Sequence, residues 1–135
     1  MTIEEVLAKY PGAETFKFGD GEALCEELLG LVRSGAKTAT CGALRDFGEG
    51  GEPRPVPGRI DIALHWDGRP GVAIRTVEVT ERRFDEVPED FAFAEGEGTF
   101  DDWKLGHERF FRRNGGFSPD MMLLCERFEV VEVFA

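Results

Sequence analysis

The chain has 135 residues, and its 16 Lys and Arg against 27 Asp and Glu give a net charge of −11. This length predicts one compact domain. Hydrophobic residues make up 41% of the chain, and 12 Phe and 2 Trp supply enough apolar volume for a packed core. The composition therefore excludes an intrinsically disordered chain.

Neither a membrane span nor a targeting leader is expected. No stretch approaches the ~20 apolar residues that cross a bilayer, and residues 1–10 are too acidic for a secretory or organellar leader. We therefore expect a cytoplasmic protein with no membrane partner. Cys25, Cys41 and Cys125 are far apart and lack a Cys-x-x-Cys spacing, so neither a disulfide framework nor a thiolate zinc site is predicted.

The negative charge also limits the partners of the protein. Proteins that grip nucleic acid through its phosphates present a basic face, and their affinity comes largely from counterion release. A chain of net charge −11 repels a long polyanion. Any role with RNA therefore requires a local cationic pocket or a ligand smaller than a strand.

Two helices are predicted in the first part of the chain. Thr2 can cap a helix over Ile3–Tyr10, which Pro11-Gly12 ends. A second helix follows the N-cap Asp20 and stops at Ser34-Gly35, where the glycine is expected to adopt the left-handed terminating conformation. Its apolar side chains recur at helical spacing and form one stripe: Leu24, Leu28, Leu31 and Val32.

The middle of the chain predicts a loop followed by a hairpin. Residues 42–58 hold five Gly and three Pro, too many for a regular element, and indicate a mobile lid or binding loop. Residues 60–66 alternate in polarity and are joined by Asp67-Gly68 to a second strand over Val72–Val79. Two further short strands are expected at Thr15–Phe18 and near Thr38–Cys41.

A helix and a strand complete the prediction. Thr99 and Asp102 resemble a capping box that begins a helix reaching about Arg113, and Met121–Phe134 has the pattern of a long terminal strand. Strands that do not alternate strictly with helices favour an α+β fold with a mostly antiparallel sheet. We expect a small, curled mixed or antiparallel β-barrel flanked by helices, in a single domain over residues 1–135.

Residues 35–40, Gly-Ala-Lys-Thr-Ala-Thr, follow a helix end and precede the flexible loop, a place where scaffolds often display working groups. They are not a phosphate-binding loop, because the Gly-Lys-Ser/Thr ending is absent. In an extended segment Lys37 and Thr40 point to opposite sides, so they converge only if the chain turns between them. The alternative interpretation is a surface lysine beside a strand.

A second candidate segment is Ala94-Glu95-Gly96-Glu97-Gly98, in which glycines separate two carboxylates. It could turn one acid inward while its backbone approaches a ligand, or it could be a solvated acidic turn. His65 and His107 are the only histidines, and neither has a ligand-like spacing to carboxylates, so no metal site is predicted. His107 is expected in a core or pocket wall, and Cys41 is expected to be structural.

These segments together resemble the ASCH-domain family. Residues 28–40 are similar to the family's Gly-x-Lys-x-x-Thr signature, and a second block is similar to that of its longer bacterial members. That block comprises Phe93–Gly98, Trp103-Lys104, His107 and Phe110-Phe111, and the likeness extends over roughly residues 16–134. The resemblance implies a PUA-like β-barrel with helices at its openings and a protein directed at RNA or nucleosides.

The resemblance also implies candidate site residues. One branch of the family hydrolyses the amide of 4-acetylcytidine with a Lys, a Thr and a Glu, which correspond here to Lys37, Thr40 and Glu97 as catalytic residues. A longer branch is described as metal-assisted ribonucleases of single-stranded RNA, which would use a divalent cation such as manganese. Residues predicted to bind substrate are Arg45 and Arg54 on the loop, Trp103 as a stacking platform, and His107.

The leading hypothesis is therefore a hydrolase of a modified nucleoside or short single-stranded RNA that needs no cofactor. The alternatives are a metal-assisted ribonuclease and a non-catalytic module that binds RNA or nucleotides. Two roles stay open for the trio. Lys37, desolvated, could be the base that activates Thr40, or Glu97 could handle protons while cationic Lys37 stabilises an oxyanion.

Overall fold

The computed structural model describes residues 1–135. The helices are α1 (Ile3–Lys9), α2 (Glu22–Ser34), α3 (Glu89–Ala94) and α4 (Phe100–Arg113). The strands are β1 (Glu14–Phe16), β2 (Ala39–Ala43), β3 (Ile60–Leu64), β4 (Pro70–Arg83) and β5 (Met122–Val133), and short 3₁₀ turns cover Leu44–Asp46 and Phe84–Glu86. No helix has the length and apolar character that crossing a membrane requires.

The five strands form one curled sheet in the order β1-β3-β4-β5-β2. β1 runs parallel to β3, and every other neighbouring pair is antiparallel. Register shifts at Ala73/Ile74 and Thr76/Glu78 interrupt the long β4–β5 ladder, and such bulges increase strand twist. The sheet curls into a half-barrel that stays open between its edge strands, β1 and β2. The predicted α+β, PUA-like class is confirmed.

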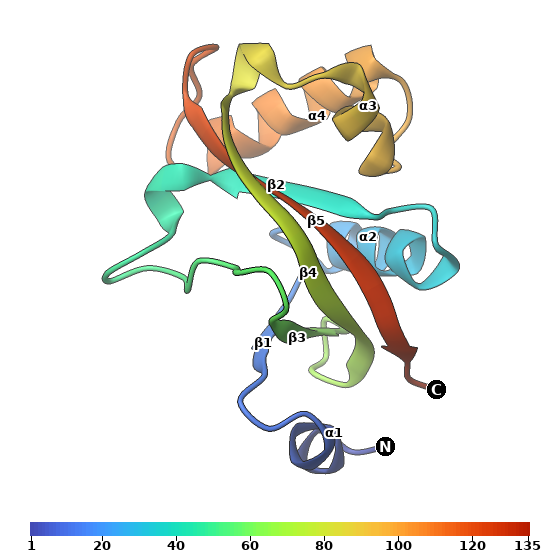
Figure 1. The fold of residues 1–135 in the computed structure, drawn as a ribbon. Helices are drawn as coiled ribbons and strands as arrows, with labels where there is room; N and C mark the ends of the chain where they lie inside the picture. Colours follow the sequence, from blue (N-terminus) through green and yellow to red (C-terminus); the bar gives the residue numbers. More distant parts are fainter.

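The helices cover different parts of this half-barrel (Figure 1). α3 and α4 lie together at one end of the β4–β5 pair, and α1 lies at the other end. The largest hydrophobic cluster joins α3 and α4 to β2 and β5 through Trp103, Phe111 and Leu123. A second cluster packs α2 against the sheet, and a third holds α1. The candidate segments at residues 35–40 and 94–98 therefore border the largest cluster.

The helix termini follow most of the sequence signals. The predicted cap at Thr2 and the predicted capping box at Thr99 are present, Thr2 also forming a capping box with Glu5, and Gly35 ends α2 with a φ of 88°. The predicted N-cap Asp20 is wrong, because Gly21 occupies that position. The Asp20 carboxylate instead accepts hydrogen bonds from Arg113 on α4, at 2.6 Å and 3.1 Å. A partner distant in sequence thus outcompetes the local cap.

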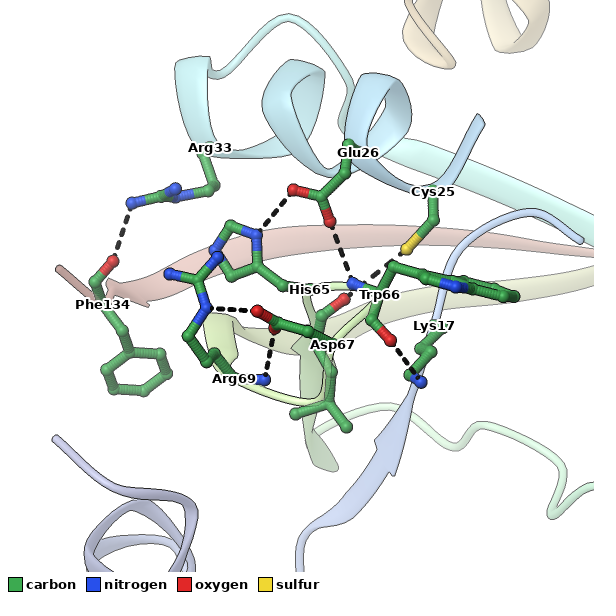
Figure 2. Close-up of polar contacts among 10 residues, drawn as sticks. Lys17, Cys25, Glu26, Arg33, His65, Trp66, Asp67, Arg69 and Phe134 are labelled. Carbon is green, nitrogen blue, oxygen red and sulfur yellow. Dashed lines mark hydrogen bonds and ion pairs between the residues drawn. The ribbon is translucent and has the colours of Figure 1, made fainter. Parts of the chain in front are cut away.

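The turn of the β3–β4 hairpin is fastened to α2 (Figure 2). The Glu26 carboxylate accepts the Trp66 backbone N–H at 2.9 Å and lies 2.8 Å from Nδ1 of His65. Beside it, Asp67 accepts a 2.7 Å hydrogen bond from Nε of Arg69. His65 therefore has a structural environment that holds the hairpin, far in sequence from the segments around Lys37 and Glu97.

Candidate functional site

The end of α2 brings Lys37 into the protein. The left-handed Gly35 terminates the helix, and the Lys37 backbone N–H then donates to the Leu31 carbonyl at 3.0 Å. This turn lies before β2, so the side chain of Lys37 does not follow the strand alternation. Lys37 is 1% exposed, and lysine is almost never buried unless its charge is paired.

Two carboxylates pair with the Lys37 ammonium. Nζ lies 3.0 Å from Oε1 of Glu95 and 3.3 Å from Oε2 of Glu97. Both acids belong to the segment that follows α3, so the sequence places them one residue apart around Gly96. The sequence predicts that one acid turns inward, whereas in the structure both carboxylates face the ammonium. Lys37 and Glu97 lie together as the sequence predicts.

Gly96 makes this close approach possible. Its φ is 74°, and a Cβ built there would lie 2.6 Å from the Ala36 carbonyl oxygen. The Thr38 backbone N–H also donates to the Ala94 carbonyl at 2.7 Å. The segments at residues 35–40 and 94–98 are therefore in backbone contact. Only glycine, which lacks a Cβ, permits so close an approach at position 96.

Glu95 is the most constrained group of the site. It is 1% exposed, and its second oxygen accepts a 2.8 Å hydrogen bond from the Trp103 indole N–H. Nε2 of His107 lies 3.6 Å from the same oxygen that faces Lys37. Nδ1 of His107 lies 2.8 Å from the carbonyl oxygen of Trp103, one helical turn earlier on α4. This contact fixes the orientation of the imidazole ring.

These contacts set the protonation of the site. Burial lowers the pKa of Lys37, but the Glu95 and Glu97 carboxylates outweigh it, so the pKa of the ammonium is raised. Burial raises the pKa of Glu95, yet Lys37 and His107 hold it below its ordinary value. Burial likewise opposes the charge of His107, but Glu95 raises the pKa of that imidazole. Glu95 is thus the fixed anion, and Lys37 is a cation.

Glu97 differs from Glu95 in its protonation. Burial raises the pKa of Glu97, and the negative charge of Glu95 adds to the increase, although Lys37 opposes it. Its side chain is 23% exposed, so it reaches solvent while it contacts Lys37. A carboxyl with a raised pKa beside an open cavity is suited to gaining and losing a proton.

A cavity of about 250 Å³ opens beside this cluster. Lys37, Glu97 and His107 line one part of it, and Thr40 from β2 lines another. Phe18 and Phe110 supply apolar walls, and the exposed Arg109 contributes a cation at the rim. The arrangement therefore combines a hydroxyl, an ammonium and a protonatable carboxyl around a space that a small group can enter.

The same region contains the one group of side chains spaced as metal ligands. Ligand atoms of Cys41, Glu95 and His107 all lie within 4.8 Å of one another. Lys37 already places a positive charge 3.0 Å from the central carboxylate, which opposes a second cation there. Burial also raises the pKa of the Cys41 thiol well above its ordinary value, so the thiolate that binds metal is disfavoured. The residues therefore do not fit a metal ion.

Several predicted binding residues lie away from the cavity. Arg45 donates to the Asn114 and Gly116 carbonyls, at 3.3 Å and 2.7 Å, and Arg54 forms a 3.5 Å surface pair with Glu81. Both are exposed and neither lines the cavity, so the prediction that they cover it is not supported by the geometry. Long flexible side chains on a loop carry no sequence signal for direction.

The stacking platform expected at Trp103 does not fit either. The indole is 1% exposed and stacks between Phe84, at a centroid distance of 5.4 Å, and His107, at 4.5 Å. Neither face of the indole is therefore free to stack on a nucleobase. Trp103 instead positions Glu95 through its N–H, whereas His107 lines the cavity wall as predicted.

Glu95 is the residue that sequence reasoning left without a role. The Glu-Gly-Glu pattern identified the segment, but it did not distinguish the two acids. The distinguishing signal is the eight-residue spacing to Trp103, because an indole N–H needs an acceptor when it is buried. That partner could not be assigned without knowing how α3 and α4 pack together.

Comparisons with known proteins agree with this geometry. A family model described as ASCH domain matches residues 14–132. A crystal structure of the Enterococcus faecalis protein EF3133 has 36% identity and a TM-score of 0.85, over 96% of this chain and 85% of that chain. An ASCH domain from Lactobacillus crispatus has 32% identity and a TM-score of 0.82, over 93% and 84%. No curated protein sequence matches the chain.

A more distant structure shares the fold alone. A variant of the ASCH protein of Zymomonas mobilis has 8% identity and a TM-score of 0.55, over 90% of this chain and 73% of that chain. The two proteins thus share the half-barrel and its helices, although they share little sequence.

Proposed function

The chain belongs to the ASCH-domain family, whose members are regarded as RNA-binding, and we propose that it is a hydrolase of an acylated cytidine in a nucleoside or a short RNA. One observation carries the proposal. The Lys37 ammonium is buried between two carboxylates at the wall of a cavity that Thr40 also lines. A fixed cation, a protonatable carboxyl and a hydroxyl around one cavity are the groups that acyl transfer requires.

In this mechanism Lys37 is the electrostatic group. Its pKa is raised, so it stays an ammonium and cannot take a proton from Thr40. The geometry therefore favours the second of the two roles left open by the sequence. An ammonium fixed by Glu95 is oriented before the reaction, and it stabilises negative charge that develops on the amide oxygen of the substrate.

Glu97 and Thr40 supply the chemistry. Ionised Glu97 accepts the Thr40 hydroxyl proton as the oxygen attacks the acyl carbon, and it then donates that proton to the departing amine of cytosine. The C–N bond breaks, and the acyl group remains as an ester on Thr40. Water attacks this ester as Glu97 accepts its proton, and Glu97 then returns that proton to the departing Thr40 oxygen, so that the carboxylic acid and free Thr40 are released.

Glu95, Trp103 and His107 are positioning residues in this proposal. The indole N–H and the imidazole hold Glu95, and Glu95 holds Lys37. Because Glu95 keeps a low pKa, its charge persists while Glu97 changes protonation. The two carboxylates thus have separate tasks, one fixed and one titrating, set by their surroundings.

The test is incubation of the purified chain with 4-acetylcytidine and with the same base in a short RNA. Chromatography should detect cytidine and acetate. Thr40→Ala should lower kcat at least about a hundredfold with little change in substrate binding, because an attacking hydroxyl acts mainly in the transition state. Thr80→Ala, on β4 and outside the cavity, is the matched control.

Two results would overturn the proposal. Tight binding of the acylated nucleoside without product would leave a binding module. Cleavage of single-stranded RNA that requires added manganese and survives Thr40→Ala would indicate a metal-assisted ribonuclease.

A further inference from the structure

A second and larger cavity adjoins the first. It has a volume of about 410 Å³ and lies where the sheet is open, between β1 and β2. Phe18, Thr40 and Phe110 line both cavities. Ligand pockets usually measure about 300–1,000 Å³, so the smaller cavity alone falls below that range. The two cavities together can accept more than a single modified group.

Asp61 contributes an unused acceptor to the larger cavity. This residue of β3 is 5% exposed, and its Oδ2 accepts hydrogen bonds from Nε and Nη2 of Arg59, at 3.0 Å and 2.7 Å. Its Oδ1 is buried and has no hydrogen-bond partner. Buried polar atoms are nearly always paired, so an unpaired carboxylate oxygen in a cavity wall indicates a missing donor.

Glu126 stands beside this acceptor. It lies on β5 directly opposite Thr40, and directly opposed residues of an antiparallel pair share one face of the sheet. Its Oε2 accepts a 2.8 Å hydrogen bond from the Thr76 hydroxyl, next to the β4 bulge. Burial raises the pKa of Glu126, and the charge of Asp61 adds to the increase. Glu126 can therefore present a proton where Asp61 presents an acceptor.

The walls of the cavity restrict what can bind there. Phe18, Phe47 and Phe110 line it, so a planar apolar group is accommodated. Acidic side chains outnumber basic ones along the wall of the cavity, which disfavours phosphate there. A neutral, flat ligand with a donor on its edge therefore fits the cavity, whereas its phosphates must lie outside, toward the exposed Arg109 of the smaller cavity.

We propose that Asp61 and Glu126 bind the amino-bearing edge of an unmodified nucleobase adjacent to the acylated cytidine. The inference rests on the proposed function and narrows its substrate to an oligoribonucleotide. An exocyclic amino group donates to the free oxygen of Asp61, as carboxylates do when they recognise cytosine N4. Uracil presents a carbonyl oxygen in the same position and is repelled.

Binding of unmodified tetranucleotides tests this proposal without any turnover. Isothermal titration at low salt should show tetracytidylate binding the intact chain about tenfold more tightly than tetrauridylate. Both ligands carry the same ribose and phosphate groups, so contacts to those parts cancel in the ratio. Equal affinities, or no binding of either ligand, would overturn the proposal.

Asp61→Asn sharpens the test. The asparagine oxygen keeps the bonds from Arg59, and its amide N–H then takes the place of the free carboxylate oxygen. The preference for cytosine should disappear or reverse toward uracil. Asp67→Asn is the matched control, because Asp67 also accepts from an arginine two residues away but lies on the hairpin turn (Figure 2). It should leave the ratio unchanged.

If Asp61 had only a structural role, Asp61→Asn would weaken the binding of both tetranucleotides equally. The ratio of the two affinities would then be preserved, and that result would overturn the proposal. Glu126→Gln gives a second measurement if Asp61→Asn folds poorly, and it should reduce the preference in part. A failure of the proposed hydrolase activity can be distinguished from a failure of the proposed subsite. A cytosine preference without turnover of 4-acetylcytidine supports this subsite alone, and turnover without preference refutes the subsite alone.

Discussion

Two clusters in this protein pair a glutamate with a histidine, and they differ mainly in burial. On the hairpin turn, Glu26 lies 2.8 Å from His65, and the Glu26 side chain is 42% exposed. At the cavity, Glu95 lies 3.6 Å from His107 and is 1% exposed. The exposed pair is the shorter one. Distance alone therefore does not show which pair has the stronger electrostatic coupling.

The surroundings of the two pairs decide their properties. The hydrogen bond from His65 lowers the pKa of Glu26, and water screens the rest of that cluster. Glu95 is buried and poorly screened, so its charge acts strongly on Lys37, Glu97 and His107. The exposed cluster fastens a turn, whereas the buried one holds charges in place beside the cavity.

The largest difference between the clusters should appear when a cation is removed. Lys37→Met leaves Glu95 and Glu97 buried without their counter-charge, and we expect a loss of about 3–5 kcal/mol in unfolding free energy. Arg69→Met removes the same charge beside Asp67 on the turn, and we expect no measurable change. Urea denaturation measures both variants.

A double variant checks the cause of that loss. Lys37→Met combined with Glu95→Gln removes both charges, so it should recover part of the stability that Lys37→Met loses. If the losses simply add, the coupling between the two residues that we infer from their 3.0 Å contact is wrong.

The second prediction concerns the carboxylates. Glu95→Gln should lower the pKa of His107, because burial then acts without the opposing charge of Glu95 and only Glu97 and the Trp103 carbonyl still favour the imidazolium. Glu26→Gln removes the equivalent carboxylate on the turn and should leave the titration of His107 unchanged. Proton NMR of the imidazole follows both. A His107 pKa that is unchanged in Glu95→Gln would contradict the electrostatic role of Glu95.

The glycines of the two regions provide a third and smaller contrast. Gly68 in the hairpin turn and Gly96 at the site both have positive φ, 94° and 74°. A Cβ at Gly68 would meet open space, so Gly68→Ala should cost about 1 kcal/mol from backbone strain alone. Gly96→Ala should cost about 2–3 kcal/mol, since it also collides with Ala36.

Activity distinguishes these two glycine variants further. Gly96→Ala should displace Glu95 and Glu97 from Lys37 and so reduce turnover, whereas Gly68→Ala should not. Equal stability and activity for the two variants would show that the contact between residues 36 and 96 does not shape the site.

The fold was largely predictable because its signals are local. Capping at Thr2 and Thr99, termination at Gly35 and the Asp67-Gly68 hairpin turn each depend on a few neighbouring residues. The short helix α3 was not predicted, since six residues between an acidic stretch and glycines give little periodicity. Asp20 failed as a cap because its partner, Arg113, lies in a distant helix.

The site was only partly predictable for the same reason. Lys37 and Glu97 were identified by the family's motifs, but their contact depends on the packing of residues 94–98 against the end of α2. Trp103 was expected to face a ligand, and only the packing of Phe84 against it shows that it faces the core. Side-chain direction between distant elements is information that a single sequence does not carry.

The smallest predicted effect is the dependence of stability on pH. The folded pKa values of Glu97 and His107 are both raised, so the folded state binds more protons than the unfolded state above their ordinary values of 4.5 and 6.5. Unfolding free energy should therefore fall as pH rises from about 5 to about 8. Glu95, with a lowered pKa, acts in the opposite sense only in stronger acid.

In each half of this pH range, the titration of one residue should set the slope of stability against pH. Glu97→Gln should flatten the lower part of the curve, and His107→Asn should flatten the part above pH 6.5. Glu26→Gln on the hairpin turn should change neither part, because the pKa of Glu26 is lowered and its carboxyl is already ionised throughout that window. Denaturant titrations at a series of pH values measure the slopes. A stability that rises with pH across the window would reverse the sign expected from a raised pKa, and Lys37 would then have to control Glu97 more strongly than burial does.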